Sequence, residues 1–103
     1  MAHALMPTQT SQLTLLRVCR ACRSEPAFMI DLVKTGVIRP AAGGRPIEWR
    51  FTPQAQQRAE MATYLWRRYG LNPEGLAFVM QLLDMNKMLR EQLRSVVDIY
   101  SGI

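Results

Sequence analysis

The residues with the clearest chemical potential are the two cysteines, which form the motif Cys19-Arg20-Ala21-Cys22. Two thiols at this spacing are typical of a redox pair or of half a zinc site. A closed zinc site needs four ligands, and the chain offers no second cysteine pair and only the distant His3. A redox pair is expected where a strand leads into a helix in an α/β pattern, which this sequence lacks.

The spacing of the neighbouring apolar residues places both thiols inside a helix. Leu15, Leu16, Cys19 and Cys22 recur at helical intervals, so the sequence predicts two buried thiols on one helix face. The chain has no paired carboxylates, no phosphate-binding loop and no nucleophile beside a base. We therefore expect no catalytic site, no metal, no cofactor and no enzymatic activity.

Composition indicates a small globular chain with anionic partners. The 103 residues are 49% hydrophobic, enough for one domain with a modest core. Eleven arginines and two lysines against eight acids give a net charge of +5, which favours acidic partners or nucleic acid. Residues 1–12 are small and polar and contain no secretory signal, so we expect a disordered tail and a cytoplasmic protein.

Capping and breaking residues divide the chain into helices and a wing. Thr14, Ser24, Thr52 and Asn72 are candidate N-caps, each placed before an apolar-periodic run. The expected helices cover residues 14–22, 24–35, 52–69 and 72–100. Between the second and third helices, residues 37–40 are extended, residues 41–46 are turn-rich, and residues 47–51 alternate as a half-buried strand. These three segments are expected to form a β-hairpin, the wing.

The last helix carries a heptad pattern. Its length is roughly 40 Å at about 1.5 Å per residue, more than a small domain needs to cover itself. A long helix with one apolar edge requires a second helix, so the sequence predicts dimerisation through this edge. The seam residues are Val79, Leu82, Asn86, Leu89, Leu93, Val96 and Tyr100.

Asn86 is the one polar residue in that seam. A lone amide in an apolar stripe specifies alignment at a cost in stability. In the alternative, the helix packs on its own domain and Asn86 lies at the rim. Five further apolar residues lie off the seam and are expected to pack on the N-terminal half: Leu76, Phe78, Leu83, Met85 and Met88.

The sequence resembles the MerR-type winged helix-turn-helix proteins. The resemblance rests on Leu13-Thr14-Leu15-Leu16, the exit Thr35-Gly36-Val37-Ile38-Arg39-Pro40, the strand Trp49-Arg50-Phe51-Thr52 and the long last helix. It implies a mainly α fold: a MerR-like winged helix-turn-helix over residues 13–70, with a small β-hairpin wing, and a long C-terminal coiled-coil dimerisation helix over residues 71–103. Within this superfamily, the short length and the missing effector domain make the sequence most similar to the CbpM-type chaperone modulators.

The resemblance also implies a function. Chaperone modulators of this type bind the J-domain of a DnaJ-like co-chaperone, the J-protein CbpA, and inhibit it. The implied partners are therefore a CbpA-like J-protein and a second copy of the chain. The alternative is a dimeric MerR-like transcriptional regulator that reads DNA through its second helix and wing.

The charges on the second helix favour the protein partner. Its outward positions present Ile30, Asp31 and a neighbouring Glu25 against Lys34, where a DNA reader needs cationic or amide side chains. We expect any DNA binding to be weak and non-specific. The candidate partner-binding residues are Glu25, Phe28, Ile30, Asp31, Lys34, Glu48 and Trp49. For Phe28 and Ile30, core or dimer packing remains an equal alternative.

Overall fold

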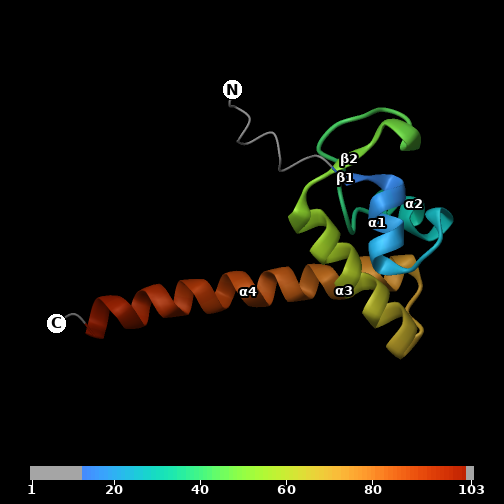
Figure 1. The fold of residues 1–103 in the computed structure, drawn as a ribbon. Coiled ribbons are helices and arrows are strands. Elements are labelled where there is room, and N and C mark those ends of the chain that lie inside the picture. Colours follow the sequence, from blue (N-terminus) through green and yellow to red (C-terminus); the bar gives the residue numbers. More distant parts are fainter. Residues whose placement is uncertain (1–12, 102–103) are drawn as a thin grey trace, which may run out of the picture.

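The protein is described by a computed structural model that covers residues 13–101 and is mainly helical, as predicted (Figure 1). The expected tail over residues 1–12 lies outside the described part. In chain order the elements are β1 (Leu13–Thr14), α1 (Leu15–Cys22), α2 (Pro26–Lys34), the 3₁₀ helix η3 (Pro46–Glu48), β2 (Arg50–Phe51), α3 (Pro53–Tyr69) and α4 (Pro73–Ser101).

Local side chains start three of the helices as predicted. The Thr14 hydroxyl accepts a hydrogen bond from the Arg17 N–H at 3.2 Å and caps α1. The Thr52 hydroxyl caps α3 in the same way, at 3.0 Å from the Ala55 N–H. The Asn72 amide oxygen accepts from the Gly75 N–H at 2.8 Å at the start of α4. Each cap satisfies a backbone donor that the first helical turn leaves unpaired.

The start of α2 differs from its prediction by one residue. The N-cap is Glu25, and Pro26 occupies the first helical position. Proline is pre-organised for that position and holds the preceding residue in the extended region, where Glu25 lies at φ −85° and ψ 152°. Ser24, the predicted cap, is therefore displaced from the helix, and its buried hydroxyl has no hydrogen-bond partner within the described residues.

The wing differs from its prediction in its pairing. The expected strand over residues 47–51 is reduced to β2, which pairs antiparallel with β1 at the start of the domain. Residues 37–40 form no strand, and the loop instead returns to β2 at the bridge between Ala42 and Arg50. The sheet therefore joins β1 to the wing and closes the domain.

A 3₁₀ turn breaks the alternation that predicted the longer strand. Pro46 cannot donate to a sheet ladder and starts η3. The Glu48 carboxylate accepts hydrogen bonds from the Arg45 N–H at 3.1 Å and from its guanidinium at 3.3 Å, which holds the turn. As a result Ile47 is 80% exposed and does not share the inward face of Trp49 and Phe51.

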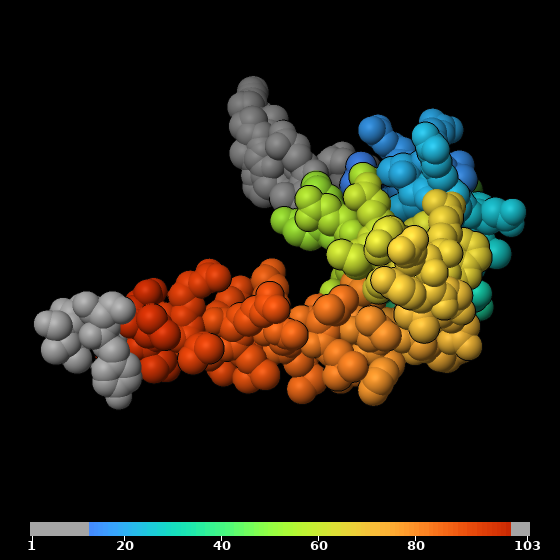
Figure 2. Space-filling view, turned by 90° about the horizontal axis from the view of Figure 1, so that it is seen from below, coloured from blue at the N-terminus to red at the C-terminus, as the bar shows by residue number. Residues whose placement is uncertain are grey.

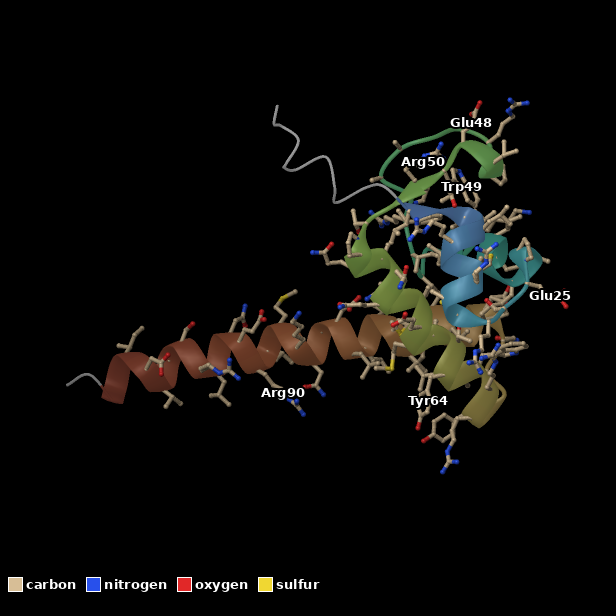
Figure 3. The ribbon with its side chains drawn as sticks, viewed as in Figure 1. Glu25, Glu48, Trp49, Arg50, Tyr64 and Arg90 are labelled. Atoms are coloured by element: carbon tan, nitrogen blue, oxygen red, sulfur yellow. The ribbon has the colours of Figure 1, made fainter. Side chains whose placement is uncertain are left out.

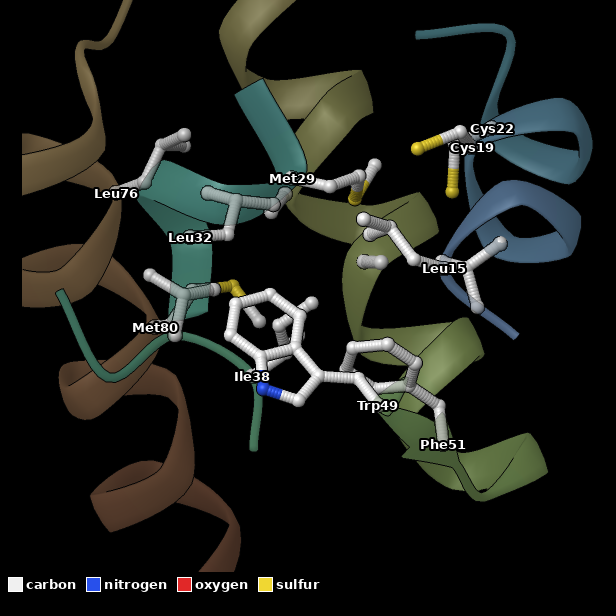
Figure 4. Packing of buried hydrophobic residues seen from close by; sticks show 14 residues of the cluster. Leu15, Cys19, Cys22, Met29, Leu32, Ile38, Trp49, Phe51, Leu76 and Met80 are labelled. Atoms are coloured by element: carbon white, nitrogen blue, oxygen red, sulfur yellow. The ribbon is translucent and has the colours of Figure 1, made fainter. Parts of the chain in front are cut away.

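The four helices and both strands, but not η3, contribute to one core (Figure 4). Its fully buried side chains include Val18 from α1, Met29 and Leu32 from α2, and Phe51 from β2. Leu76 completes this core from the first turn of α4. Burying an aliphatic or aromatic side chain stabilises the fold by about 1.5–3 kcal/mol. The first turns of α4 thus belong to the domain.

Beyond these turns α4 leaves the domain and projects as a single helix (Figures 1 and 2). Leu76 and Met80 are its buried residues. Of the five residues expected to pack on the N-terminal half, only Leu76 does so. The prediction is wrong for the other four, which are exposed, namely Phe78, Leu83, Met85 and Met88. Phe78 lies on the side of α4 opposite Leu76 and Met80, and the other three follow Met80, the last buried residue among those described in α4.

Arg58 of α3 fixes the point at which α4 leaves the domain. The Arg58 guanidinium binds both carboxylate oxygens of Asp84, at 2.8 and 2.7 Å. Its Nε–H also donates to the Val37 carbonyl at 2.5 Å, just after α2. One side chain therefore ties α3, α4 and the exit of α2 together.

Candidate partner-binding site

Helix α2 presents one face to the core and another to solvent. Met29 and Leu32 are fully buried, and they orient the helix. Glu25, Asp31 and Lys34 then lie exposed, as the helical period predicts. We call the five predicted residues of this helix, Glu25, Phe28, Ile30, Asp31 and Lys34, the α2 face.

The two apolar members of the α2 face are partly used inside the domain. Phe28 stacks on Trp66 of α3, with ring centroids 4.5 Å apart and an interplanar angle of 25°. Ile30 is half-buried and packs against the core. Stacked aromatic pairs stabilise by about 0.5–1.5 kcal/mol beyond their buried area. The predicted alternative of core packing therefore accounts for part of both side chains.

Trp49 is not exposed, although its predicted contact with a partner requires exposure. It is only 8% exposed, and its ring meets Phe51 edge to face with centroids 6.1 Å apart. The prediction that Trp49 contacts a partner from an exposed position is wrong, because β2 turns its side chain into the core. Its role is to hold the wing on the domain.

Glu48 is exposed on the wing, apart from the α2 face. Figure 3 shows Glu48 on the wing at the top of the view and Glu25 lower down, where α1 leads into α2. Hydrogen bonds from the Arg45 backbone and side chain lower the pKa of the Glu48 carboxyl, so it is charged at neutral pH. The structure thus brings together the residues of α2 and leaves Glu48 as a separate position.

The charges on the α2 face differ from those of a helix that reads DNA. The exposed charged groups of the α2 face are two carboxylates and one ammonium, from Glu25, Asp31 and Lys34. In the wing, Arg45 pairs with Glu48, and Arg50 donates to the Trp49 carbonyl at 2.8 Å. A helix that enters the major groove requires donors toward bases and phosphates, and acids there are repulsive.

The predicted seam of α4 is exposed from Leu82 to Val96. Leu82, Leu89, Leu93 and Val96 are all exposed, with Leu93 at 64%, and Asn86 lies among them. Val79 is half-buried where α4 leaves the domain; the side chain of Tyr100 lies outside the described part.

Two further residues widen this seam. Phe78 and Met85 lie three or four residues from Leu82, so they belong to the same side of the helix. Phe78 is 63% exposed. The turns that contact the domain do so through Leu76, Met80 and Asp84, which a helical period places on the opposite side. The seam thus points away from its own domain.

Two interactions that shape the site had no signal in the sequence. Phe28 and Trp66 are far apart in the chain, as are Arg58 and Asp84, and neither pair belongs to a motif. Only the tertiary fold brings the members of each pair together. The exposure of Phe78 could have been inferred from its spacing to Leu82.

Two general classes of site can be tested within the described residues. Residues 13–101 contain no cluster of three or more side chains suited to hold a metal ion. No helix in this part of the chain is both long enough and apolar enough to cross a membrane.

Comparison with known proteins gives two results. The sequence model of a family described as MerR HTH family regulatory protein matches residues 13–97. The chaperone modulatory protein CbpM of Pseudomonas putida (strain W619) is 30% identical over 81 residues, which cover 79% of this chain and 79% of the relative.

Further relatives carry the same name. The CbpM protein of Coxiella burnetii (strain Dugway 5J108-111) is 27% identical over 88 residues, covering 85% of this chain and 82% of the relative. That of Pseudomonas entomophila (strain L48) is 28% identical over 81 residues, covering 79% of each. These names describe modulators of chaperones and indicate no enzyme class.

Proposed function

The chain belongs to the MerR HTH family of regulatory proteins and, within it, to the chaperone modulatory proteins of the CbpM type, and from this membership we propose that it binds the J-domain of a DnaJ-like co-chaperone and inhibits that co-chaperone. Inhibition works by occupancy. A J-domain covered by this chain is not available to Hsp70, so inhibition rises with the fraction of J-protein bound.

The observation that carries this proposal is the charge of the α2 face. A helix-turn-helix that reads DNA presents cations at these positions, and here Glu25 and Asp31 stand beside Lys34. Exposed carboxylates around the half-buried Phe28 and Ile30 fit a protein contact with an apolar centre and a charged rim. A basic surface on the J-domain is the matching partner.

Within this site the residues take different roles. Asp31 and Glu25 supply the attraction and the orientation, since complementary charge governs encounter and register. Phe28 and Ile30 offer the part of their surface that Trp66 and the core leave uncovered. Glu48 acts as a second, smaller contact from the wing.

The active form in this proposal is a homodimer joined through α4. The exposed apolar side of α4 points away from its own domain, which leaves it for a second copy. Asn86 would then align the two helices. A dimer presents two α2 faces and can hold two J-domains.

The test is the substitution Asp31→Arg, measured by titration calorimetry against the J-domain of a CbpA-like protein. Reversing this charge removes an attraction and adds a repulsion, so we expect affinity to fall about tenfold or more, equivalent to about 1.4 kcal/mol. The matched control is Asp98→Arg, which makes the same charge change on the exposed far end of α4 and is expected to bind within about twofold of the parent.

Two results would contradict the proposal. Unchanged J-domain binding by the Asp31→Arg variant would place the contact elsewhere. Tight, sequence-selective DNA binding at about 0.15 M salt without J-domain binding would establish the transcriptional regulator instead. Weak binding that ignores sequence and disappears with salt would reflect only the net charge of +5.

A further inference from the structure

A hollow lies where the end of α1 meets the outer side of α3, a region that the proposed function leaves unused. Its volume is about 470 Å³, and it is lined by Ala21, Cys22, Arg23, Glu60, Thr63, Tyr64, Arg67 and Arg68. Three of these side chains are exposed arginines, and one is an exposed acid. Tyr64 is 56% exposed and points outward from α3 (Figure 3).

A second hollow continues the first along α1. It has a volume of about 360 Å³ and is lined by Arg17, Arg20, Ala21 and Gln56, so Ala21 belongs to both hollows. Together the two hollows are lined by five arginines and one acid, Glu60. We call the five arginines the α1–α3 arginine track: Arg17, Arg20, Arg23, Arg67 and Arg68.

Internal interactions account for only part of this track. Arg67 donates to the Arg23 carbonyl and lies over the Trp66 ring, 5.9 Å from its centroid. Within residues 13–101 the ion pairs are Arg45–Glu48 and Arg58–Asp84, and neither includes an arginine of the track. Residues 1–12 carry no acid.

Helix dipoles account for the track only in part as well. Cations near a helix C-terminus are favourable, which suits Arg20, Arg67 and Arg68. Arg17 lies in the first turn of α1, where the dipole disfavours a cation. Helix stability therefore accounts for Arg20, Arg67 and Arg68 but not for Arg17.

We propose that the α1–α3 arginine track binds an acidic polypeptide segment of a partner protein. Guanidinium groups present fixed forks that match carboxylates, and arginine and tyrosine are among the residues enriched at the centres of protein contacts. Glu60 sits in the main hollow and would repel a continuous phosphate backbone, whereas a peptide can place a neutral or cationic residue there. The charge of this surface is opposite to that of the α2 face, so it takes a different segment.

The test uses a fluorescein-labelled peptide of about ten residues, glutamate and aspartate with two glycines in the middle to face Glu60, long enough to span about 35 Å when extended. Fluorescence anisotropy at about 0.15 M salt measures its binding to the full chain. The variant Arg20→Glu with Arg68→Glu reverses one charge in each hollow, and we expect affinity to fall about tenfold or more. The control Arg90→Glu with Arg94→Glu makes the same total change on α4 and is expected to stay within about twofold.

Each other outcome overturns the proposal. Equal losses in both double variants would mean that only net charge matters. Tighter binding of an oligonucleotide with the same number of negative charges would assign the track to nucleic acid. Loss of J-domain binding in Arg20→Glu with Arg68→Glu would make the track part of that contact instead of a separate site. Circular dichroism checks folding, and Arg20→Gln with Arg68→Gln replaces the variant if reversal unfolds it.

Discussion

Burial governs the chemistry of Cys19 and Cys22. Both are free thiols inside the core, as the helical spacing predicted. Loss of solvation raises the pKa of each thiol; at Cys22 a hydrogen bond with Thr63 opposes this only in part. Attack and metal binding both require the thiolate. The motif is therefore a packing feature of α1.

At the scale of single residues, we predict that Cys19 and Cys22 of the folded chain react slowly. A thiol reagent at neutral pH should modify the folded chain at least about 100-fold more slowly than the chain in guanidinium chloride, because the thiols react only when the domain opens. The measurement is the absorbance of the released chromophore over time. Rapid modification of the native chain, or zinc retained in a 1:1 ratio after purification, would show that the motif is reactive after all.

At the scale of elements, one ion pair joins α3 to α4. The hydrogen bonds from Arg58 lower the pKa of the Asp84 carboxyl, so folding favours its charged form. That stabilisation is fully present above the ordinary aspartate pKa of about 3.9 and is lost as the pH falls through the lower pKa of the folded chain. Both side chains are partly solvated, and the effect is correspondingly small.

The substitution Asp84→Asn tests this link. We expect it to lower the free energy of unfolding at pH 7 by about 0.5–1 kcal/mol, and we expect the difference from the parent to vanish in strong acid. Urea unfolding followed by circular dichroism between pH 7 and pH 2 measures both. Asp98→Asn, at an exposed position without a partner within the described residues, serves as the control and should track the parent throughout.

At the scale of the whole molecule, α4 carries more apolar surface than one chain can cover. Its seam lies on the side opposite Leu76 and Met80, and Phe78 and Met85 widen it. A contiguous exposed apolar surface of this kind marks an interaction site. The proposed dimer covers it and sets the spacing of the two domains, because the Arg58–Asp84 pair holds each α4 at a defined angle.

The substitution Leu89→Glu should dissociate the proposed dimer. A carboxylate in the middle of the seam loses its water on dimerisation without gaining a partner, which costs several kcal/mol and raises the dissociation constant about 100-fold or more. Sedimentation equilibrium over a range of concentrations measures this. Ser95→Glu, on the other side of α4, is the matched control. A parent chain that stays monomeric at high concentration would exclude the dimer.

The predictions succeeded where short-range chemistry decides. Thr14, Thr52 and Asn72 cap their helices by accepting a hydrogen bond from the backbone N–H three positions on. They failed where two segments compete for one position. Pro46 starts a 3₁₀ turn that reduces the strand to β2, and β1 replaces residues 37–40 as its partner.

In the candidate site too, the predictions succeeded only for residues whose exposure depends on short-range spacing. The helical period correctly placed Glu25, Asp31 and Lys34 in solvent, whereas Trp49 is buried because β2 packs on the core. Phe28 stacks on a ring of α3, which no local pattern indicates. Half-buried residues depend on which distant element approaches them, so their exposure is not a property of their own segment.

The sequence by itself determined the helices, three of their four N-caps, the buried thiols and the apolar stripe of α4, because each depends on residues within about four positions of one another. The tertiary structure alone decided how α4 leaves the domain and how far half-buried side chains such as Phe28 are covered. Arg58 reaches Val37 across 21 residues and Asp84 across 26, and contacts at such separations exist only once the chain has folded. Short-range interactions stabilise single helices and strands, whereas the surfaces that bind partners arise from how those elements pack.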